Sequence, residues 1–184
     1  MRRSINNFIS VIHSFFRFLL LKLIHGKRIK VATIERFSPN VVFEAAKGSC
    51  VSIGKCVRAH SGCKFKVRKN AVLNIGDGVK INYNCIFVCR ERIDIGSGTE
   101  FGPSVYIYDH DHDYSVGLKA GKFKSSPISI GKNCWIGANT VILRGSSIGD
   151  NCVIGAGSIV SKDIPDNSVF VQKRMNVIQK IEEN

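Results

Sequence analysis

The sequence is short of acidic residues and of proline. It has 14 acidic residues against 27 basic ones, which leaves a net charge of +13, and four prolines against seventeen glycines. So few prolines beside so many glycines indicate that glycine has a recurring structural role, rather than that the chain is mostly loops. With 44% hydrophobic and 22% charged residues, the composition excludes a disordered chain. The basic surplus favours anionic partners, such as nucleic acid, a phosphorylated cofactor or an acidic membrane face.

The signatures of nucleic-acid binding are missing. No stretch interleaves basic with aromatic residues, and no recognition fold can be read from the sequence. We therefore expect no nucleic-acid partner.

Disulfide pairs and zinc ligands also have little support. The seven cysteines are an odd number without a CxxC pair, and only Cys85 and Cys89 are spaced at all closely. No secretory signal with a small-residue cleavage site is recognisable. We expect a cytoplasmic protein in a reducing compartment, with thiols that act as small buried hydrophobic side chains.

Residues 1–30 form a segment of their own, with a helix expected over Ser4–Ile24. The longest stretch without a charge, Ser4–Phe16, is shorter than the ~20 residues needed to span a bilayer. Basic residues surround the apolar face, as in helices that lie in a membrane interface. Packing on the chain's own domain or on a neighbouring subunit is the alternative. The apolar face has three-four spacing and comprises Ile5, Phe8, Ile9, Ile12, Phe15, Phe16, Leu19 and Leu23.

A period of six residues dominates the C-terminal half. Every sixth residue from Ile130 is aliphatic through Val160, and glycine usually follows it. The members of this series are Ile130, Ile136, Ile142, Ile148, Ile154 and Val160. The same phase returns in pieces upstream, at Ile53, Ile75, Ile81, Phe87, Ile95, Phe101 and Ile107.

A period of six fits neither a helix nor a long flat strand, but it fits a short strand followed by a corner. Three such sides close into a triangular coil whose sixth residues stack inside, with turns at Gly131-Lys132-Asn133 and Gly149-Asp150-Asn151. The sequence therefore predicts an all-β parallel β-helix over residues 31–168. The N-terminal helix caps one end and residues 169–184 the other, where residues 177–181 could form a closing strand or helix.

The repeat is interrupted once, at residues 108–127. The interruption begins with the run Tyr108-Asp109-His110-Asp111-His112-Asp113-Tyr114 and continues as a basic, glycine-containing stretch. Because long insertions in compact domains are usually functional, we expect this loop to leave the solenoid and carry part of a site.

The motifs Trp135-Ile136-Gly137 and Ile154–Pro165 resemble those of the hexapeptide-repeat acetyltransferases, above all the maltose, galactoside and polysaccharide O-acetyltransferases. The resemblance covers residues 75–165. It implies a left-handed coil, against the usual right-handed preference, and a homotrimer that uses acetyl-CoA. The implied reaction is acetyl transfer to a hydroxyl of a sugar or of a lipid-linked or polysaccharide precursor. A serine or nucleotide-sugar acetyltransferase, or a metal-dependent or non-catalytic β-helix, is the alternative.

In this family a histidine on or beside the ejected loop acts as the general base. His110 is the first candidate for that role and His112 the second, with Asp109 as the neighbouring carboxylate that fixes the tautomer. Asn84 matches a family asparagine that contacts the acceptor or the oxyanion, although an asparagine ladder at a coil corner would explain it equally well. A metal site is not expected, since only His60 offers a ligand from another coil.

The resemblance also implies where the acetyl-CoA arm binds, in a groove between subunits. Lys162 would face a phosphate, while Trp135 could instead simply cover a coil. The glycine-x-proline segment of many relatives is replaced by Gln172-Lys173-Arg174-Met175, whose Lys173 and Arg174 could meet the 3′-phosphate. The other expected cofactor contacts are Gly137, Ala138, Gly155, Ala156 and Ser161.

Overall fold

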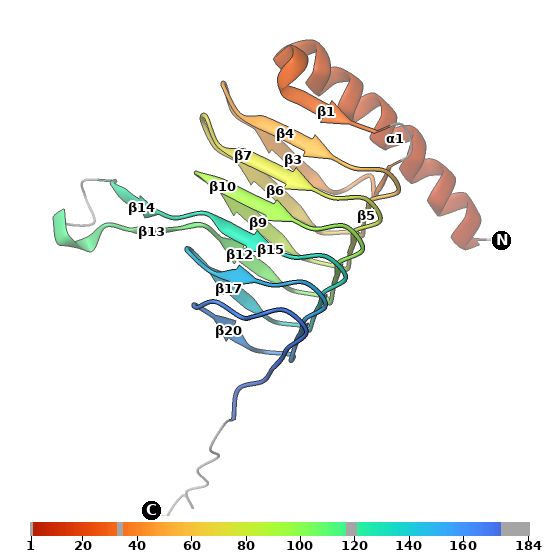
Figure 1. Cartoon of the computed structure of the whole chain (residues 1–184). Coiled ribbons are helices and arrows are strands. Elements are labelled where there is room, and N and C mark those ends of the chain that lie inside the picture. The colour runs from red at the N-terminus through yellow and green to blue at the C-terminus, as the bar shows by residue number, and fades with distance from the viewer. Residues whose placement is uncertain (1, 33–34, 117–120, 174–184) are drawn as a thin grey trace, which may run out of the picture.

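The protein is a column of short strands with one helix lying across its N-terminal end (Figure 1). The structure, a computed structural model, describes residues 2–32, 35–116 and 121–173. Helix α1 (Arg2–His25) leads through a short 3₁₀ turn, η1 (Gly26–Arg28), into the first strand. The expected cap at residues 177–181 lies outside the described residues, as does Arg174.

Nineteen of the strands among the described residues form three parallel sheets, here named A, B and C. Sheet A contains β1 (Ile29–Val31), β4 (Cys50–Ile53), β7 (Val72–Ile75), β10 (Arg92–Ile95), β15 (Ile128–Ile130) and β18 (Ser147–Ile148). Sheet B contains β2 (Arg36–Phe37), β5 (Arg58–Ala59), β8 (Lys80–Ile81), β11 (Glu100–Phe101), β16 (Trp135–Ile136), β19 (Val153–Ile154) and β21 (Val169–Phe170). Sheet C contains β3 (Val42–Ala45), β6 (Lys64–Val67), β9 (Ile86–Cys89), β12 (Tyr106–Tyr108), β17 (Val141–Leu143) and β20 (Ile159–Val160).

Each coil takes one strand from each sheet, and pairing inside all three sheets is parallel. Six such coils follow one another before β21, so the predicted β-helix is confirmed. The strict period of six belongs to the C-terminal coils, where Ile136 pairs with Ile154, three hexads further on. In the N-terminal coils Val51 pairs with Leu73, 22 residues further on, because the sides formed by β4 and β6 have four residues. This longer coil explains why the repeat appeared only in pieces upstream.

The interior of the column is filled by the residues that repeat from coil to coil. Ile136, Ile142, Ile148 and Ile154 are all buried, as the period requires. Toward the N-terminal end the filling becomes aromatic. The Phe65 ring stacks on Phe43 and Phe87, with centroids 5.4 and 4.9 Å away.

The corners are built as the sequence indicated. Asn133 and Asn151 have φ angles of 54° and 57°, a left-handed conformation that asparagine tolerates. The Asn151 amide donates to the Asn167 oxygen of the next coil at 3.0 Å. At another corner Gly137 has no room for a side chain, since a Cβ there would lie 2.5 Å from the Ala156 nitrogen.

Five of the seven cysteines are buried, as expected, but Cys50 and Cys56 are exposed. The prediction was wrong for these two because alternation along β4 turns Cys50 outward, and Cys56 sits at a corner with a φ of 59°.

Helix α1 packs on the first coil with the side opposite to its expected apolar face. Ser14 and Phe18 are buried against the solenoid, and the Phe18 ring lies 5.1 Å from Phe37. The apolar face itself is exposed. By length and composition alone, α1 is long and apolar enough to cross a membrane.

The insertion leaves the column as expected, but it does so as a β-hairpin arm (Figure 1). Strand β13 (His110–His112) pairs antiparallel with β14 (Phe123–Ser125), and a 3₁₀ turn, η2 (Tyr114–Val116), follows β13. The arm emerges between coils four and five, after β12 and before β15.

Candidate active site

The candidate site is centred on Asp109, at the point where β12 ends and the hairpin begins. Its carboxylate is fully buried beneath the turn that joins β9 of coil three to β10 of coil four. The backbone N–H of Arg90 donates to Oδ1 at 2.8 Å, while those of Glu91 and Arg92 donate to Oδ2 at 2.7 and 3.0 Å. Three backbone donors converging on one buried carboxylate hold its charge and its orientation.

Asp109 orients the histidine that follows it. The Oδ1 atom of Asp109 lies 3.0 Å from Nδ1 of His110, whose side chain is 12% exposed. Because an ionised carboxylate can only accept hydrogen bonds, Nδ1 of the neutral ring carries the proton and Nε2 keeps its lone pair. A fixed tautomer with a free Nε2 is what a general base requires.

Two aromatic rings flank the His110 ring, Phe123 from the hairpin and Tyr108 from β12 of the column. The centroids of Phe123 and Tyr108 lie 5.5 and 6.3 Å from the centroid of the imidazole. The Arg90 guanidinium stacks over the Phe123 ring, 3.3 Å from its centroid. Burial, reinforced by the nearby charge of Arg68, lowers the pKa of Arg90, and burial raises the pKa of Tyr108, which keeps its hydroxyl protonated.

His112 lies further out on the same strand, where it is exposed. Its ring contacts Phe123, with centroids 4.5 Å apart, but within the described part of the chain it has no hydrogen bond or ion pair. Asp111, between the two histidines, pairs with Arg144 of coil five at 2.5 Å, which ties the hairpin to the column. The orienting carboxylate therefore distinguishes His110 from His112.

Asn84 lies at a different edge of the column. It occupies the corner before β9, with a φ of 61°, and its N–H donates to the Ser61 carbonyl one coil back. His110 follows the other end of the same sheet, since Val88 of β9 pairs with Tyr108 of β12. Asn84 precedes Val88 by four residues, roughly 13 Å of extended chain. One chain therefore does not bring Asn84 and His110 together.

The expected cofactor residues divide between the two corners that border sheet C. Before sheet C, Gly137 and Ala138 lie over Gly155 and Ala156 of the next coil, with the Gly137 N–H bonded to the Ile154 carbonyl at 2.8 Å. Trp135, on neighbouring sheet B, is 58% exposed. Beyond sheet C lie the exposed residues Ser161 and Lys162, whose ammonium is 5.8 Å from the Phe170 ring. Lys173 is exposed beyond β21.

The outer surface of sheet C connects these two corners and is apolar from coil three to coil six. The outward positions of sheet B are by contrast all charged in the first four coils, as at Arg36 and Glu100, and become apolar only from Trp135 onward. Sequence analysis missed this surface, although strand alternation opposite the buried hexad positions would have revealed it. We name it the sheet C face, and it comprises Ile86, Val88, Tyr106, Tyr108, Val141, Leu143 and Ile159.

Within the described residues, no group of three or more His, Cys, Asp or Glu side chains is arranged to hold a metal ion. The residues around Asp109 present an oriented imidazole beside the apolar sheet C face.

Comparison with known proteins agrees with this architecture. Residues 127–162 match a family model described as the hexapeptide repeat of succinyl-transferase. The chain is 51% identical over 75 residues to Nodulation protein L of Rhizobium meliloti, a match that covers 40% of this chain and 41% of that protein. It is 41% identical over 90 residues to galactoside O-acetyltransferase of Escherichia coli, covering 48% and 44%. The chain thus matches less than half the length of these two relatives.

A solved structure extends the similarity over most of the chain. The maltose O-acetyltransferase of Clostridium difficile 630 is 33% identical, with a TM-score of 0.52, over 85% of this chain and 73% of that one. The repeats, the β-helix and this extended identity agree, and the chain belongs to the hexapeptide-repeat acetyltransferase family.

Proposed function

We propose that the protein is an acetyl-CoA-dependent O-acetyltransferase whose acceptor is a hydroxyl of a sugar or of a lipid-linked or polysaccharide precursor. The observation that carries this proposal is the Asp109–His110 pair, with Nδ1 held at 3.0 Å from a buried carboxylate. The family of the chain supplies the reaction class, and the oriented imidazole supplies the base that this reaction needs.

The proposed reaction is a direct transfer. Nε2 of His110 removes the proton from the acceptor hydroxyl, and the oxygen attacks the thioester carbonyl of acetyl-CoA. The new imidazolium is stabilised by Asp109 through Nδ1–H. The tetrahedral intermediate then collapses, the C–S bond breaks, and the proton passes from His110 to the departing thiolate, which gives the acetyl ester and CoA. Cysteine is not required as a nucleophile.

We further propose that the active enzyme is a homotrimer in which the sheet C faces meet. An apolar outer face on a strand layer is a surface that association buries. His110 borders this face at one end and Asn84 at the other, so contact between copies could bring His110 of one copy to Asn84 of the next. The pantetheine arm of acetyl-CoA would then lie in the same groove, between Gly137-Ala138 and Ser161-Lys162.

The first test is thiol release from acetyl-CoA by wild type, His110→Ala and His112→Ala, with a panel of sugars, amino sugars and lipid-linked saccharides. We expect acceptor-dependent release that falls about 10²–10⁴-fold in His110→Ala and stays within threefold in His112→Ala. Equal loss in both variants would contradict the base assignment. Preference for an amino sugar would replace O-acetylation by N-acetylation, and failure to bind acetyl-CoA would contradict the transferase proposal itself.

Mixed assemblies test the shared site. His110→Ala and Asn84→Ala are each expected to be inactive, and each is unfolded and refolded alone or together with the other. If the site joins two copies, an interface is active only when one copy keeps His110 and its neighbour keeps Asn84. In a random mixture of the two variants each condition is met in half of the interfaces, so about a quarter of the sites are restored. If both residues act within one chain, the mixture stays as inactive as its parents.

A further inference from the structure

Helix α1 presents an unusually large apolar surface to the outside. Phe8 is 67% exposed and Leu23 is 75% exposed, and eight more large apolar side chains of the helix are exposed between them or beside them. We name this surface the outer face of α1, and it comprises Ile5, Phe8, Ile9, Ile12, Phe15, Phe16, Leu19, Leu20, Leu23 and Ile24. At 1.5 Å per residue the 24-residue helix is about 36 Å long, so the face extends over much of the N-terminal end of the column.

The opposite side of α1 is fastened to the column by polar groups. The Ser14 hydroxyl accepts a bond from the Phe37 N–H at 2.8 Å. The Arg17 guanidinium donates to the Pro39 carbonyl at 2.9 Å, and the Lys22 ammonium donates to the Val31 carbonyl at 3.0 Å. With one side fixed in this way, the orientation of the outer face is fixed as well.

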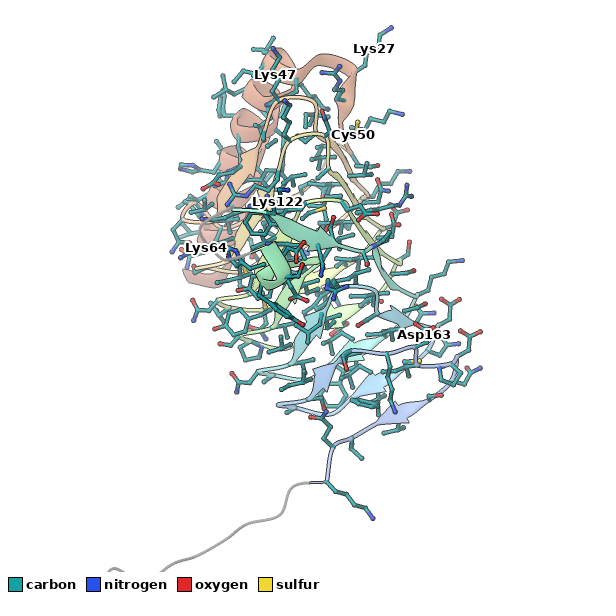
Figure 2. The ribbon with its side chains drawn as sticks, turned by 90° about the vertical axis from the view of Figure 1, so that its left-hand side faces the viewer. Lys27, Lys47, Cys50, Lys64, Lys122 and Asp163 are labelled. Carbon is teal, nitrogen blue, oxygen red and sulfur yellow. The ribbon has the colours of Figure 1, made fainter. Side chains whose placement is uncertain are left out.

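The charge of the protein is concentrated at this same end. Residues 1–73 contain 15 of the 27 basic residues and two of the 14 acidic ones, so they account for the whole net charge of +13. Residues 74–184 contain 12 basic and 12 acidic residues. The first acidic residue of the chain is Glu35, so neither α1 nor the turn after it contains a negative charge. Figure 2 shows Lys27 and Lys47 at the α1 end of the column and Asp163 toward the other.

We propose that α1 lies flat on an anionic bilayer, with its outer face among the acyl chains and the cations of residues 1–73 near the headgroups. Apolar burial and attraction to anionic lipid act together in such helices. The charge distribution favours an anionic bilayer over other partners, because an anionic surface complements the end of the column that carries all the excess positive charge.

The bonds on the inner side favour a flat helix over a spanning one. To cross the bilayer, α1 would have to release the column and carry Arg17 and Lys22 into hydrocarbon, where each charge costs about 3 kcal/mol. Lying flat, the helix keeps both residues bonded to the column and turns an almost entirely apolar face to lipid, with the exposed polar side chains Asn6 and His13 at its edge.

The test is co-sedimentation of the full chain with vesicles of phosphatidylcholine, with and without phosphatidylglycerol. We expect binding that requires the anionic lipid and is reversed by high salt. Phe16→Glu should weaken it at least tenfold, because it puts a charge in the middle of the outer face. Val169→Glu is the control, since Val169 is also an exposed apolar residue but lies on β21 at the far end of the column, and the change should leave binding unchanged.

A second pair of variants isolates the charge. Lys27→Gln with Lys30→Gln should weaken binding roughly 25-fold, as about 1 kcal/mol for each cation near an anionic surface implies. Lys122→Gln with Lys132→Gln removes the same charge elsewhere and should have little effect. Circular dichroism confirms that each variant is folded.

Three outcomes would overturn the proposal. Equal binding to neutral vesicles would remove the role of charge. Binding that resists both high salt and alkaline carbonate would indicate a spanning helix. Absence of vesicle binding, together with a change in mass of Phe16→Glu by analytical ultracentrifugation, would show that the outer face is covered by another copy. None of these outcomes depends on transferase activity.

Discussion

Replacing Asp109 with asparagine is the sharpest test of how the site works. The carboxylate receives N–H bonds from three consecutive residues on one side and faces Nδ1 of His110 on the other. An asparagine can satisfy only one side. If its oxygen stays under the backbone donors, its NH₂ group faces Nδ1, and the imidazole proton must move to Nε2. Nε2 can then no longer accept the proton of the acceptor.

The opposite orientation costs more. With the NH₂ group under the turn, the N–H groups of Glu91 and Arg92 would lose their acceptor, at about 1–3 kcal/mol for each buried donor. We therefore expect Asp109→Asn to keep its fold, lose about 1–3 kcal/mol of stability, and hold His110 in the wrong tautomer. Its kcat should fall about 10²–10⁴-fold, the range of general-base catalysis, with the KM for acetyl-CoA nearly unchanged.

The assay is initial-rate thiol release for Asp109→Asn, His110→Ala and the double variant. Because Asp109 acts through His110, the double variant should be no slower than His110→Ala alone. Asp111→Asn is the control, since Asp111 is exposed and, among the described residues, its carboxylate pairs with Arg144 alone. The reasoning is refuted if a folded Asp109→Asn keeps its kcat within threefold of wild type, or if the two losses multiply.

Three further predictions concern stability. Burial raises the pKa of Glu35 to about 7, so the folded protein loses stability progressively as the pH rises from about 4.5 to 7 and this carboxyl ionises. Glu35→Gln should therefore leave the midpoint of thermal unfolding unchanged at pH 4. At pH 8 it should raise that midpoint by several degrees, because it adds up to about 3 kcal/mol to the free energy of unfolding. Phe65→Ala should lower the free energy of unfolding by about 3–5 kcal/mol in denaturant titrations, whereas Phe8→Ala, the same deletion at an exposed site, should change it by less than about 0.5 kcal/mol. Gly137→Ala should destabilise the fold by more than about 1 kcal/mol and weaken acetyl-CoA binding in calorimetry, because its Cβ would meet backbone atoms of the next coil. Gly78→Asn is the control, at a φ of 69° with open space around it, and should change neither stability nor acetyl-CoA binding.

The sequence predicted best those features that depend on a constant coil length. From Ile130 onward the coils are 18 residues long, so aliphatic residues recur at six and the fold can be read directly. Upstream, the coil from Val51 to Leu73 takes 22 residues. No fixed period can then assign which residues stack, although the stacked residues are equally apolar. The fold of the whole column was therefore predicted from the regular repeat of its C-terminal coils.

The site was predictable only where its parts are neighbours in the chain. Asp109 and His110 are adjacent, so their pairing could be expected from the sequence. The backbone donors from Arg90 to Arg92 could not, because they reach Asp109 through the register of β9 on β12, which depends on the length of an irregular coil. The contact of Arg90 with Phe123 depends on the hairpin as well. For the same reason, the spacing of α1 predicted a helix and its apolar face but not that Ser14 would bond to Phe37 and turn that face outward.

The sheet C face and the outer face of α1 are both apolar surfaces of the described chain, and the charge around them favours different occupants. The sheet C face is uncharged from coil three to coil six and is bordered by His110 at one end and Asn84 at the other. Association between copies favours a neutral surface of this kind, because it buries no unpaired charge. The outer face of α1 lies instead in the part of the chain that carries the entire net charge. Placing that face between copies of one chain would bring like charges together, which costs free energy, whereas an anionic bilayer turns the same charges into attraction. The distribution of charge therefore favours copies of the chain at the sheet C face and lipid at α1.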